Sequence, residues 1–135
     1  MINTKYKTIL VTLLVMLVLV LIGSYHGRNF RANHLLTVGK IVGYDKGCGT
    51  KGVYGQNLHY EYYADGKLLR DSRQTSQLPC DIGVHIIGKT FPVAYRKYWY
   101  GYENNILMIP EDFKLYGHPF PDSLKWMLQY DQSNK

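Results

Sequence analysis

The chain carries two cysteines and five histidines, the side chains whose chemistry extends to metal binding, disulfide formation or nucleophilic catalysis. A zinc site would combine Cys48 and Cys80 with His59 and His85, but no Cys-x-x-Cys or His-x-x-x-His spacing supports one. No histidine lies in a Ser/His/Asp or Cys/His pattern. We therefore predict no metal, no cofactor and no enzyme, and a hydrolase using His59 or His85 is the least favoured of three functional hypotheses.

The glycine-rich stretch DKGCGTKG, which surrounds Cys48, lacks the spacing of a phosphate-binding loop. We interpret it as a flexible loop between two strands, because glycine adopts backbone conformations that other residues avoid. Its functional interest is therefore confined to the cysteine that it carries.

One cluster of side chains is unusual because it combines aromatic rings with cations over eight residues. Tyrosine, tryptophan and arginine are common contact residues for proteins, glycans and lipid headgroups. The plainer interpretation is a half-buried strand followed by a wide turn, whose rings cover the core edge or lie at a membrane interface. The candidate interaction surface consists of Tyr95, Arg96, Tyr98, Trp99, Tyr100 and Tyr102.

The run from Thr8 to Tyr25 is uncharged and almost wholly aliphatic. As a helix it would cover about 27 Å, close to the hydrocarbon thickness of a bilayer. We predict a membrane anchor over residues 1–25 that contacts lipid through residues 8–25. A cleaved signal peptide is the alternative, although Gly23-Ser24 offers only half of a cleavage site. A buried helix of a soluble core is disfavoured, since nothing else in the chain is apolar enough to surround it.

Basic residues flank both ends of this run. Lys5 and Lys7 precede it, and Arg28 and Arg31 follow it. The positive-inside rule and the short leader together favour an amino terminus inside and an extracytoplasmic domain. From Arg28 onward the chain has fourteen basic and ten acidic residues. This mild excess is typical of a solvated surface near anionic headgroups and is not the dense patch of a nucleic-acid binder.

After a polar linker over residues 26–34, strand-like segments follow one another at hairpin spacing. We predict a small antiparallel β domain over residues 35–130, built as a meander or partly open barrel, with short C-terminal helices and a frayed tail over residues 131–135. No helix is predicted between the strands. The five predicted strands are Leu35 to Tyr44, Val53 to Tyr63, Lys67 to Gln77, Thr90 to Tyr98 and Asn105 to Ile109.

Within the first of these segments, Gly39 and Gly43 are predicted to lie on one face, which indicates a bent or coiled strand. Asp65-Gly66 predicts a two-residue hairpin turn, because both central positions need positive φ. That turn pairs Tyr62 with Leu69 and Glu61 with Arg70.

Extended further along the strands, the same register brings Cys80 opposite Lys51, close to Cys48. A structural disulfide between Cys48 and Cys80 would suit an extracytoplasmic domain. Two unlinked thiols are the alternative, because the ladder is not expected to remain regular as far as Pro79.

Two segments after the last strand predict short helices. Pro110 suits the first position of a helical turn that ends at Gly117. A terminal helix, SLKWMLQY, would pack an apolar stripe against the sheet and place Trp126 over Tyr130. The stripe consists of Leu124, Met127 and Leu128.

Five sequence stretches, VGKIVGYDKG, YEYYADGK, GKTFPVAY, NNILMIPEDF and FPDSLKW, resemble a group of small bacterial membrane proteins of unknown function. The resemblance implies a single amino-terminal hydrophobic helix before a compact β domain, and it implies no active-site residues. The stretch RKYWYGYENN departs from that group as a longer aromatic insertion. It is therefore the segment most individual to this chain.

Together these features predict a non-enzymatic, membrane-anchored β domain that acts as a protein-interaction module at the cell envelope. An immunity-type inhibitor is a special case. The partner would be another protein or a second copy of the chain, and nucleic acid is not expected. The alternative is a module that binds a cell-wall or surface glycan through the Tyr/Trp cluster.

Overall fold

A computed structural model describes residues 3–48 and 55–133 of the chain. The chain forms two compact units, Met1–Asn33 and His34–Lys135. The first is a single helix and the second is a β domain with its own core.

The first unit is the helix α1, Thr4–Ala32, whose first turn is capped by Asn3. No part of its most apolar 18-residue window is buried, and the helix is long and apolar enough to cross a membrane. It does not end at Tyr25, as predicted, but continues to Ala32, so most of the predicted linker is helical. Polar residues such as Arg28 and Arg31 are good helix formers, and nothing in the linker sequence stops the helix.

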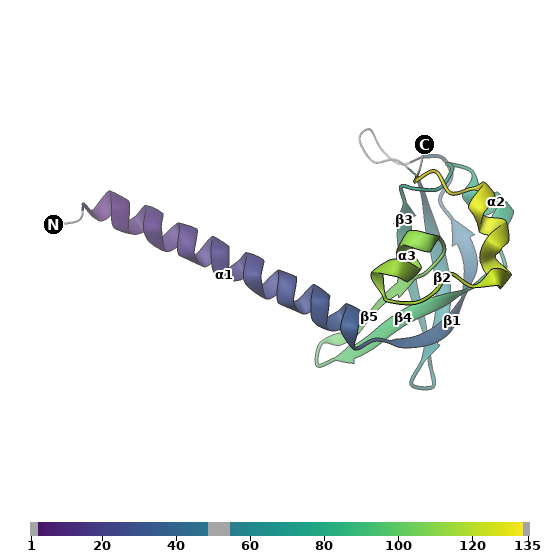
Figure 1. The fold of residues 1–135 in the computed structure, drawn as a ribbon, viewed down its shortest axis with the longest axis horizontal. Helices are drawn as coiled ribbons and strands as arrows, with labels where there is room; N and C mark the ends of the chain where they lie inside the picture. Colours follow the sequence, from purple (N-terminus) through teal and green to yellow (C-terminus); the bar gives the residue numbers. More distant parts are fainter. Residues whose placement is uncertain (1–2, 49–54, 134–135) are drawn as a thin grey trace. The chain divides into compact units, whose positions relative to one another are not determined.

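The second unit is built on a five-stranded antiparallel sheet in the order β3-β2-β1-β4-β5 (Figure 1). This confirms the predicted mainly β fold and its antiparallel pairing. The order also places the first strand in the middle, because β4 returns to pair with β1 after β3 is complete. The strands are β1 Leu35–Tyr44, β2 Gln56–Ala64, β3 Lys67–Thr75, β4 Thr90–Tyr98 and β5 Gly101–Ile106.

Strand β1 is bent, so that its first half pairs with β4 and its second half with β2. Gly39 belongs to both ladders, and a Cβ atom there would lie 2.5 Å from Val93 Cγ2 in the core. A bulge between Ile41 and Gly43 then shifts the register by one residue. The two glycines therefore lie on opposite faces, and the prediction that they share a face is wrong because the strand is not regular.

The β2–β3 hairpin has the predicted register, including Tyr62 opposite Leu69 and Glu61 opposite Arg70. Its turn residues, Asp65 and Gly66, have φ angles of 51° and 75°. These positive values explain why an Asp-Gly pair is found here.

Strands β3 and β5 are the two edges of the sheet, and the successive antiparallel pairings make them run in the same direction. Side chains rather than a backbone ladder join these edges into a nearly closed barrel, along a line that we call the seam. Tyr102 Oη donates to Asp65 Oδ2 at 2.8 Å, and Asn104 Nδ2 donates to Asp71 Oδ2 at 2.6 Å. Arg73 completes the seam by donating from Nη1 to the carbonyl oxygen of Ile106 at 2.6 Å.

Three short helices complete the β domain: α2 Ile82–Ile86, α3 Pro110–Leu115 and the 3₁₀ helix η1 Asp122–Gln129. The sequence predicts no helix between the strands, and α2, which lies between β3 and β4, corrects that prediction. It has no side-chain cap hydrogen bond and spans one turn, so it depends on burying Ile82 and Ile86.

The terminal helix differs from the predicted one in its period. As a 3₁₀ helix it has about 3.0 residues per turn, so the i,i+4 contact of Trp126 with Tyr130 does not form. Trp126 instead lies 6.0 Å from Phe91 and Tyr130 stacks on His85, both measured between ring centroids. Leu124 and Met127 are buried as predicted, whereas Leu128 is 47% exposed.

Cys48 and Cys80 form a disulfide, with their Cα atoms 4.9 Å apart and 32 residues between them in sequence. The bond joins the end of the β1 segment to the residues just before α2. Of the two alternatives that the sequence left open, the structure contains the bonded one. Lys51, on which the predicted register relied, lies outside the described residues.

Other element boundaries differ from the predicted ones at their ends. Val53 lies outside the described residues, β3 ends at Thr75, and β5 begins at Gly101 rather than Asn105. In the predicted frayed tail, the backbone N–H of Gln132 donates to the Gln77 carbonyl oxygen at 2.9 Å.

Candidate functional site

Alternation along β2 separates the two faces of the sheet. Leu58, Tyr60 and Tyr62 point into the core and are at most 2% exposed. Their neighbours His59 and Glu61 are only partly buried and point to the other side, which we call the outer face. On β1, β2 and β3 this face consists of Val38, Lys40, Val42, His59, Glu61, Tyr63, Leu68, Arg70 and Ser72.

Large apolar side chains of the outer face lie on three neighbouring strands. Tyr63 pairs with Leu68. On β1, Val38 directly precedes Gly39, which pairs with Tyr62. Val38 is 62% exposed, Tyr63 61% and Leu68 47%. Apolar side chains that are exposed singly are normal, but neighbouring ones are typical of an interaction surface.

A charged band crosses the same face beside these apolar side chains. Arg70 Nη2 lies 2.7 Å from Glu61 Oε1, and Lys40 is the cross-strand partner of Glu61 on the other side. The Arg70 side chain is 76% exposed, so the pair contributes little to stability. Its exposed charges are available to a partner.

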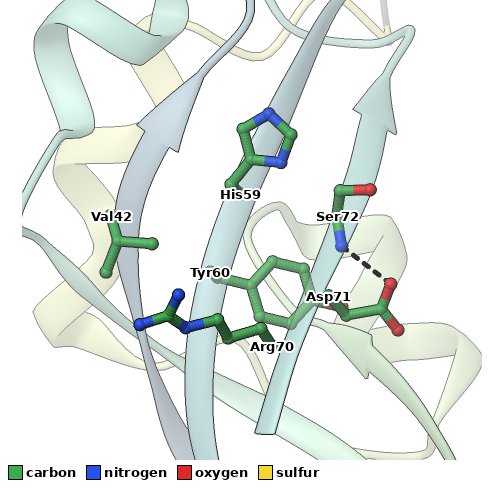
Figure 2. A pocket seen from close by; sticks show the side chains of 6 residues that line it. All are labelled: Val42, His59, Tyr60, Arg70, Asp71 and Ser72. Atoms are coloured by element: carbon green, nitrogen blue, oxygen red, sulfur yellow. Dashed lines mark hydrogen bonds between the residues drawn. The ribbon is translucent and has the colours of Figure 1, made fainter.

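A shallow pocket of about 390 Å³ lies on the outer face (Figure 2). The Arg70 side chain extends from β3 across β2 toward Val42 and forms one wall, and His59 rises at the upper end. The pocket lining is Val42, His59, Tyr60, Arg70, Asp71 and Ser72. Such a lining offers a cation, an imidazole and an apolar wall to a bound side chain.

His59 is the one predicted catalytic candidate that lies at this pocket. Its Nε2 atom is 2.8 Å from Asp45 Oδ1, and Asn57 Nδ2 donates to Asp45 Oδ2 at 2.9 Å. The hydrogen bond to His59 and, to a smaller extent, that to Asn57 lower the pKa of the Asp45 carboxyl. The Ser72 hydroxyl is directed away from the His59 ring in Figure 2, so the pocket contains no activated nucleophile of the Ser/His/Asp kind.

His85 is similarly partnered, with Nε2 3.2 Å from Asp81 Oδ2, and both side chains are largely exposed. Among the described residues no group of three or more His, Cys, Asp or Glu side chains could hold a metal ion. Cys48 and Cys80 form a disulfide with each other, so their sulfur atoms are not thiolate ligands for a zinc site with His59 and His85.

The predicted aromatic cluster lies on the β4–β5 hairpin, residues 95–102, which we call the aromatic hairpin. Its strands pair as far as Tyr98 with Gly101, so Trp99 and Tyr100 form a tight two-residue turn. The predicted wide turn is therefore wrong. Gly101, with a φ of 139°, adopts a conformation that other residues disfavour and so allows the chain to reverse within two residues.

The tip of the aromatic hairpin is exposed and ordered by contacts among its own rings. Trp99 is 94% exposed and Tyr100 51%. The Tyr100 ring stacks on Tyr98, with ring centroids 5.4 Å apart, and meets Trp99 edge to face. A hydrogen bond from the Tyr100 hydroxyl to Glu103 raises the pKa of Tyr100 to about 12.

The base of the aromatic hairpin is occupied by internal contacts. Tyr95 lies between Tyr62 and Tyr102, at centroid distances of 6.4 and 6.5 Å. The Arg96 guanidinium lies 5.2 Å from the Tyr98 ring centroid. The hydrogen bond from Tyr102 to Asp65 raises the pKa of Tyr102. Of the six predicted residues, Trp99 and Tyr100 therefore present most of the accessible surface.

The structure places the six predicted residues on one hairpin, and it adds the apolar part of the outer face, which the sequence reasoning did not name. Val38, Tyr63 and Leu68 belong to three different strands, and each looks like an ordinary strand residue by itself. The signal that could have found them is the hairpin register, which already pairs Tyr63 with Leu68 on the face opposite the core.

No protein-family model, no curated protein and no solved structure matches this chain. The functional argument therefore depends on the geometry of its surfaces.

Proposed function

We propose that the protein is a membrane-anchored, non-enzymatic β domain that binds a protein partner at the cell envelope. The observation that carries this proposal is the outer face, where exposed Val38, Tyr63 and Leu68 adjoin the charged Lys40–Glu61–Arg70 band. Neighbouring apolar side chains beside fixed charges are the usual composition of a specific protein interface.

Two features support the proposal that the β domain is anchored to a membrane on its extracytoplasmic side. Helix α1 has the length and apolar composition of a membrane span, and its apolar window is wholly exposed. The Cys48–Cys80 disulfide is of a kind that persists in oxidising compartments and is rare in the cytosol. Together they favour an anchor that leaves the β domain on the extracytoplasmic side.

The glycan alternative receives less support from the geometry. A sugar is typically bound on a flat aromatic platform, yet Trp99 and Tyr100 meet at an interplanar angle of 89°. Tyr95 and Tyr102 are engaged with neighbouring rings. A hydrolase receives less support still, because His59 and His85 each pair with a carboxylate but with no nucleophile among the described residues.

The proposal is tested by photo-crosslinking in cells that naturally produce the full-length protein. A photoreactive amino acid replaces Leu68 on the outer face or, as the matched control, Leu128 on η1; both leucines are 47% exposed. We expect position 68 to yield one defined protein adduct that position 128 does not. An adduct of twice the chain mass would identify the partner as a second copy.

A charge-swap variant tests whether the charged band contributes to recognition. Glu61→Arg combined with Arg70→Glu keeps an opposite-charge pair across the strands but reverses its direction on the outer face. The swap also sets a cation opposite Lys40, but because Arg70 is 76% exposed we expect a stability change of no more than about 1 kcal/mol, which urea denaturation checks. We expect the adduct at position 68 to disappear in this variant, and equal adducts from positions 68 and 128 would refute the proposal.

A further inference from the structure

The topology places two turns at the end of the β domain from which the chain continues to α1. Strand β1 starts at Leu35, next to the unit that contains α1, and β2 and β4 run antiparallel to it. The β2–β3 and β4–β5 turns therefore both lie where β1 begins, as Figure 1 shows within the β domain. We call this the tethered end.

The two turns are held together as one surface by a hydrogen bond. Tyr102 Oη, beside the β4–β5 turn, donates to Asp65 Oδ2 in the β2–β3 turn at 2.8 Å. Each turn closes a hairpin whose strands are paired up to the turn, Ala64 with Lys67 and Tyr98 with Gly101. The tethered end is thus a rigid platform, not a pair of independent loops.

The composition of the tethered end is that of a protein segment in a membrane interface. Trp99 is 94% exposed and adjoins the half-exposed Tyr100. Lys67 and Lys97 are exposed cations on the strand ends beside the two turns, while Asp65 and Glu103 each accept a hydrogen bond from a tyrosine hydroxyl. Tryptophan and tyrosine are enriched at the headgroup level, and each nearby lysine contributes about 1 kcal/mol of attraction to an anionic leaflet.

The length of chain between the apolar run and β1 allows this platform to reach a bilayer. Residues 26–32 are helical and span about 10 Å. The three steps from Ala32 to Leu35 add at most about 10 Å. Leu35 pairs with Tyr95, and Trp99 follows the end of β4 four residues further toward the tethered end, at most about 13 Å away. Trp99 can therefore return to within roughly 7 Å of the hydrocarbon edge, which is the depth of the headgroup layer.

We propose that the tethered end docks on the headgroup layer of the bilayer that contains α1, with Trp99 inserted at the interface and Lys67 and Lys97 facing anionic phosphates. This inference rests on the anchoring part of the proposed function. Docking would direct the sheet strands away from the bilayer and leave the outer face open to a partner.

The test uses the full chain reconstituted in vesicles of phosphatidylcholine, with or without phosphatidylglycerol. The chain has two tryptophans, Trp99 and Trp126. Quenching by lipids brominated near the headgroup is measured for Trp126→Phe, which retains Trp99, and for Trp99→Phe, which retains Trp126. Trp126→Phe alters the contact of Trp126 with Phe91, so the Trp99 signal is also obtained in a second way. The fluorescence of Trp99→Phe is subtracted from that of the unsubstituted chain, and both of these chains keep Trp126.

Docking predicts that lipid quenches Trp99 severalfold more than Trp126, and more strongly in anionic vesicles. Lys67→Gln with Lys97→Gln should lower the ratio of docked to undocked protein in anionic vesicles by roughly 30-fold. The matched control is Lys46→Gln with Lys89→Gln, at the opposite end of the sheet. It should have little effect, because nine-residue β4 spans about 30 Å and the Debye length is about 10 Å. Both lysine pairs are compared in the Trp126→Phe background, because Lys89 lies 5.9 Å from the Trp126 ring centroid.

Vesicle flotation separates the two proposals. If the full chain does not float with vesicles, the anchoring proposal and this inference both fail. If it floats but Trp99 is no better quenched than Trp126, or if both lysine pairs have the same effect, docking alone is overturned.

Discussion

Replacing Arg73 by methionine should destabilise the β domain more than the loss of a surface ion pair would, because Arg73 joins the two edges of the sheet. Its Nη1 and Nη2 atoms donate to the two oxygens of Asp112 at 2.9 and 2.8 Å. Asp112 Oδ2 also accepts from the backbone N–H groups of Met108 and Ile109, at 2.9 and 3.2 Å. The carboxylate is thus shared between the seam and the start of α3.

The magnitude follows from burial. The side chains of Arg73 and Asp112 are only 22% and 8% exposed. Arg73→Met would leave a buried carboxylate without its cation, which typically costs about 3–5 kcal/mol. A domain of this size has a total stability of about 5–15 kcal/mol, so the loss would be a large part of the whole.

Arg70→Met is the matched control, because Arg70 lies on the same strand and also pairs with a carboxylate, Glu61, at 2.7 Å. The Arg70 side chain is 76% exposed and that of Glu61 24%, against 8% for Asp112. Water and the neighbouring Lys40 therefore still screen the Glu61 charge, and the loss should cost no more than about 1 kcal/mol. Urea denaturation of the full chain in mild detergent, followed by near-ultraviolet circular dichroism, measures both. With a slope of about 1.5 kcal/mol per M, Arg73→Met should lower the midpoint by roughly 2–3 M and Arg70→Met by less than about 0.7 M.

Equal shifts for the two variants would refute the view that a buried ion pair holds the seam. A second check is Asp112→Asn combined with Arg73→Met. Because this pair removes both charges, it should recover part of the stability lost by Arg73→Met alone.

Three further predictions concern the core and its covalent link. Burial raises the pKa of Tyr60 above its ordinary value of 10.0, so the unfolded chain loses this proton first and stability falls as pH rises above 10. Tyr60→Phe removes the hydrogen bond that the Tyr60 hydroxyl donates to Asn104 Oδ1 and should cost about 1 kcal/mol near neutral pH. Because phenylalanine has no proton to lose, this deficit should vanish or reverse by about pH 11, as measured by urea midpoints. Removing the disulfide by Cys48→Ser with Cys80→Ser should lower stability by about 3–4 kcal/mol, and a reductant should then have no further effect on the variant. Gly39→Ala should cost about 1–3 kcal/mol in thermal or urea melts because its Cβ would clash in the core, whereas Gly43→Ala, whose Cβ has 3.7 Å of space, should change stability little.

The parts of the fold that the sequence predicts correctly are those set by local chemistry. The Asp65-Gly66 turn fixes the β2–β3 register, since few other residue pairs accept two positive φ angles. Pro110 and Gly117 similarly bracket α3. In these places the turn or cap residues decide the structure by themselves.

The parts that it does not predict depend on contacts between distant segments. The return of β4 to β1 and the closure of the seam join residues that are far apart in sequence. Asp71 and Arg73 lie on the core face of β3, where an apolar residue is expected, because their side chains reach across to β5. Helix α2 has no side-chain cap hydrogen bond, although Asp81 stands at its N-cap position, and it spans one turn whose apolar residues are buried.

The candidate site likewise has one part that the sequence indicates and one part that depends on strand pairing. The aromatic hairpin is visible in the sequence because its rings are consecutive, but their separation into an exposed tip and a packed base depends on the tight turn at Trp99-Tyr100. The outer face is invisible until β1, β2 and β3 are placed in register. Val38 and Tyr63 come onto adjacent strands only through the pairing of Gly39 with Tyr62, the residues beside them.

The most direct test of a water-exposed β domain tethered to a membrane is fractionation of producing cells combined with protease treatment from outside. The account predicts full-length chain, uncut at Gly23-Ser24, in membranes washed with alkaline carbonate, with the β domain degraded when protease is added to intact spheroplasts. Recovery of the uncut chain in the supernatant without detergent would contradict the anchor, and protection from external protease would contradict the extracytoplasmic location.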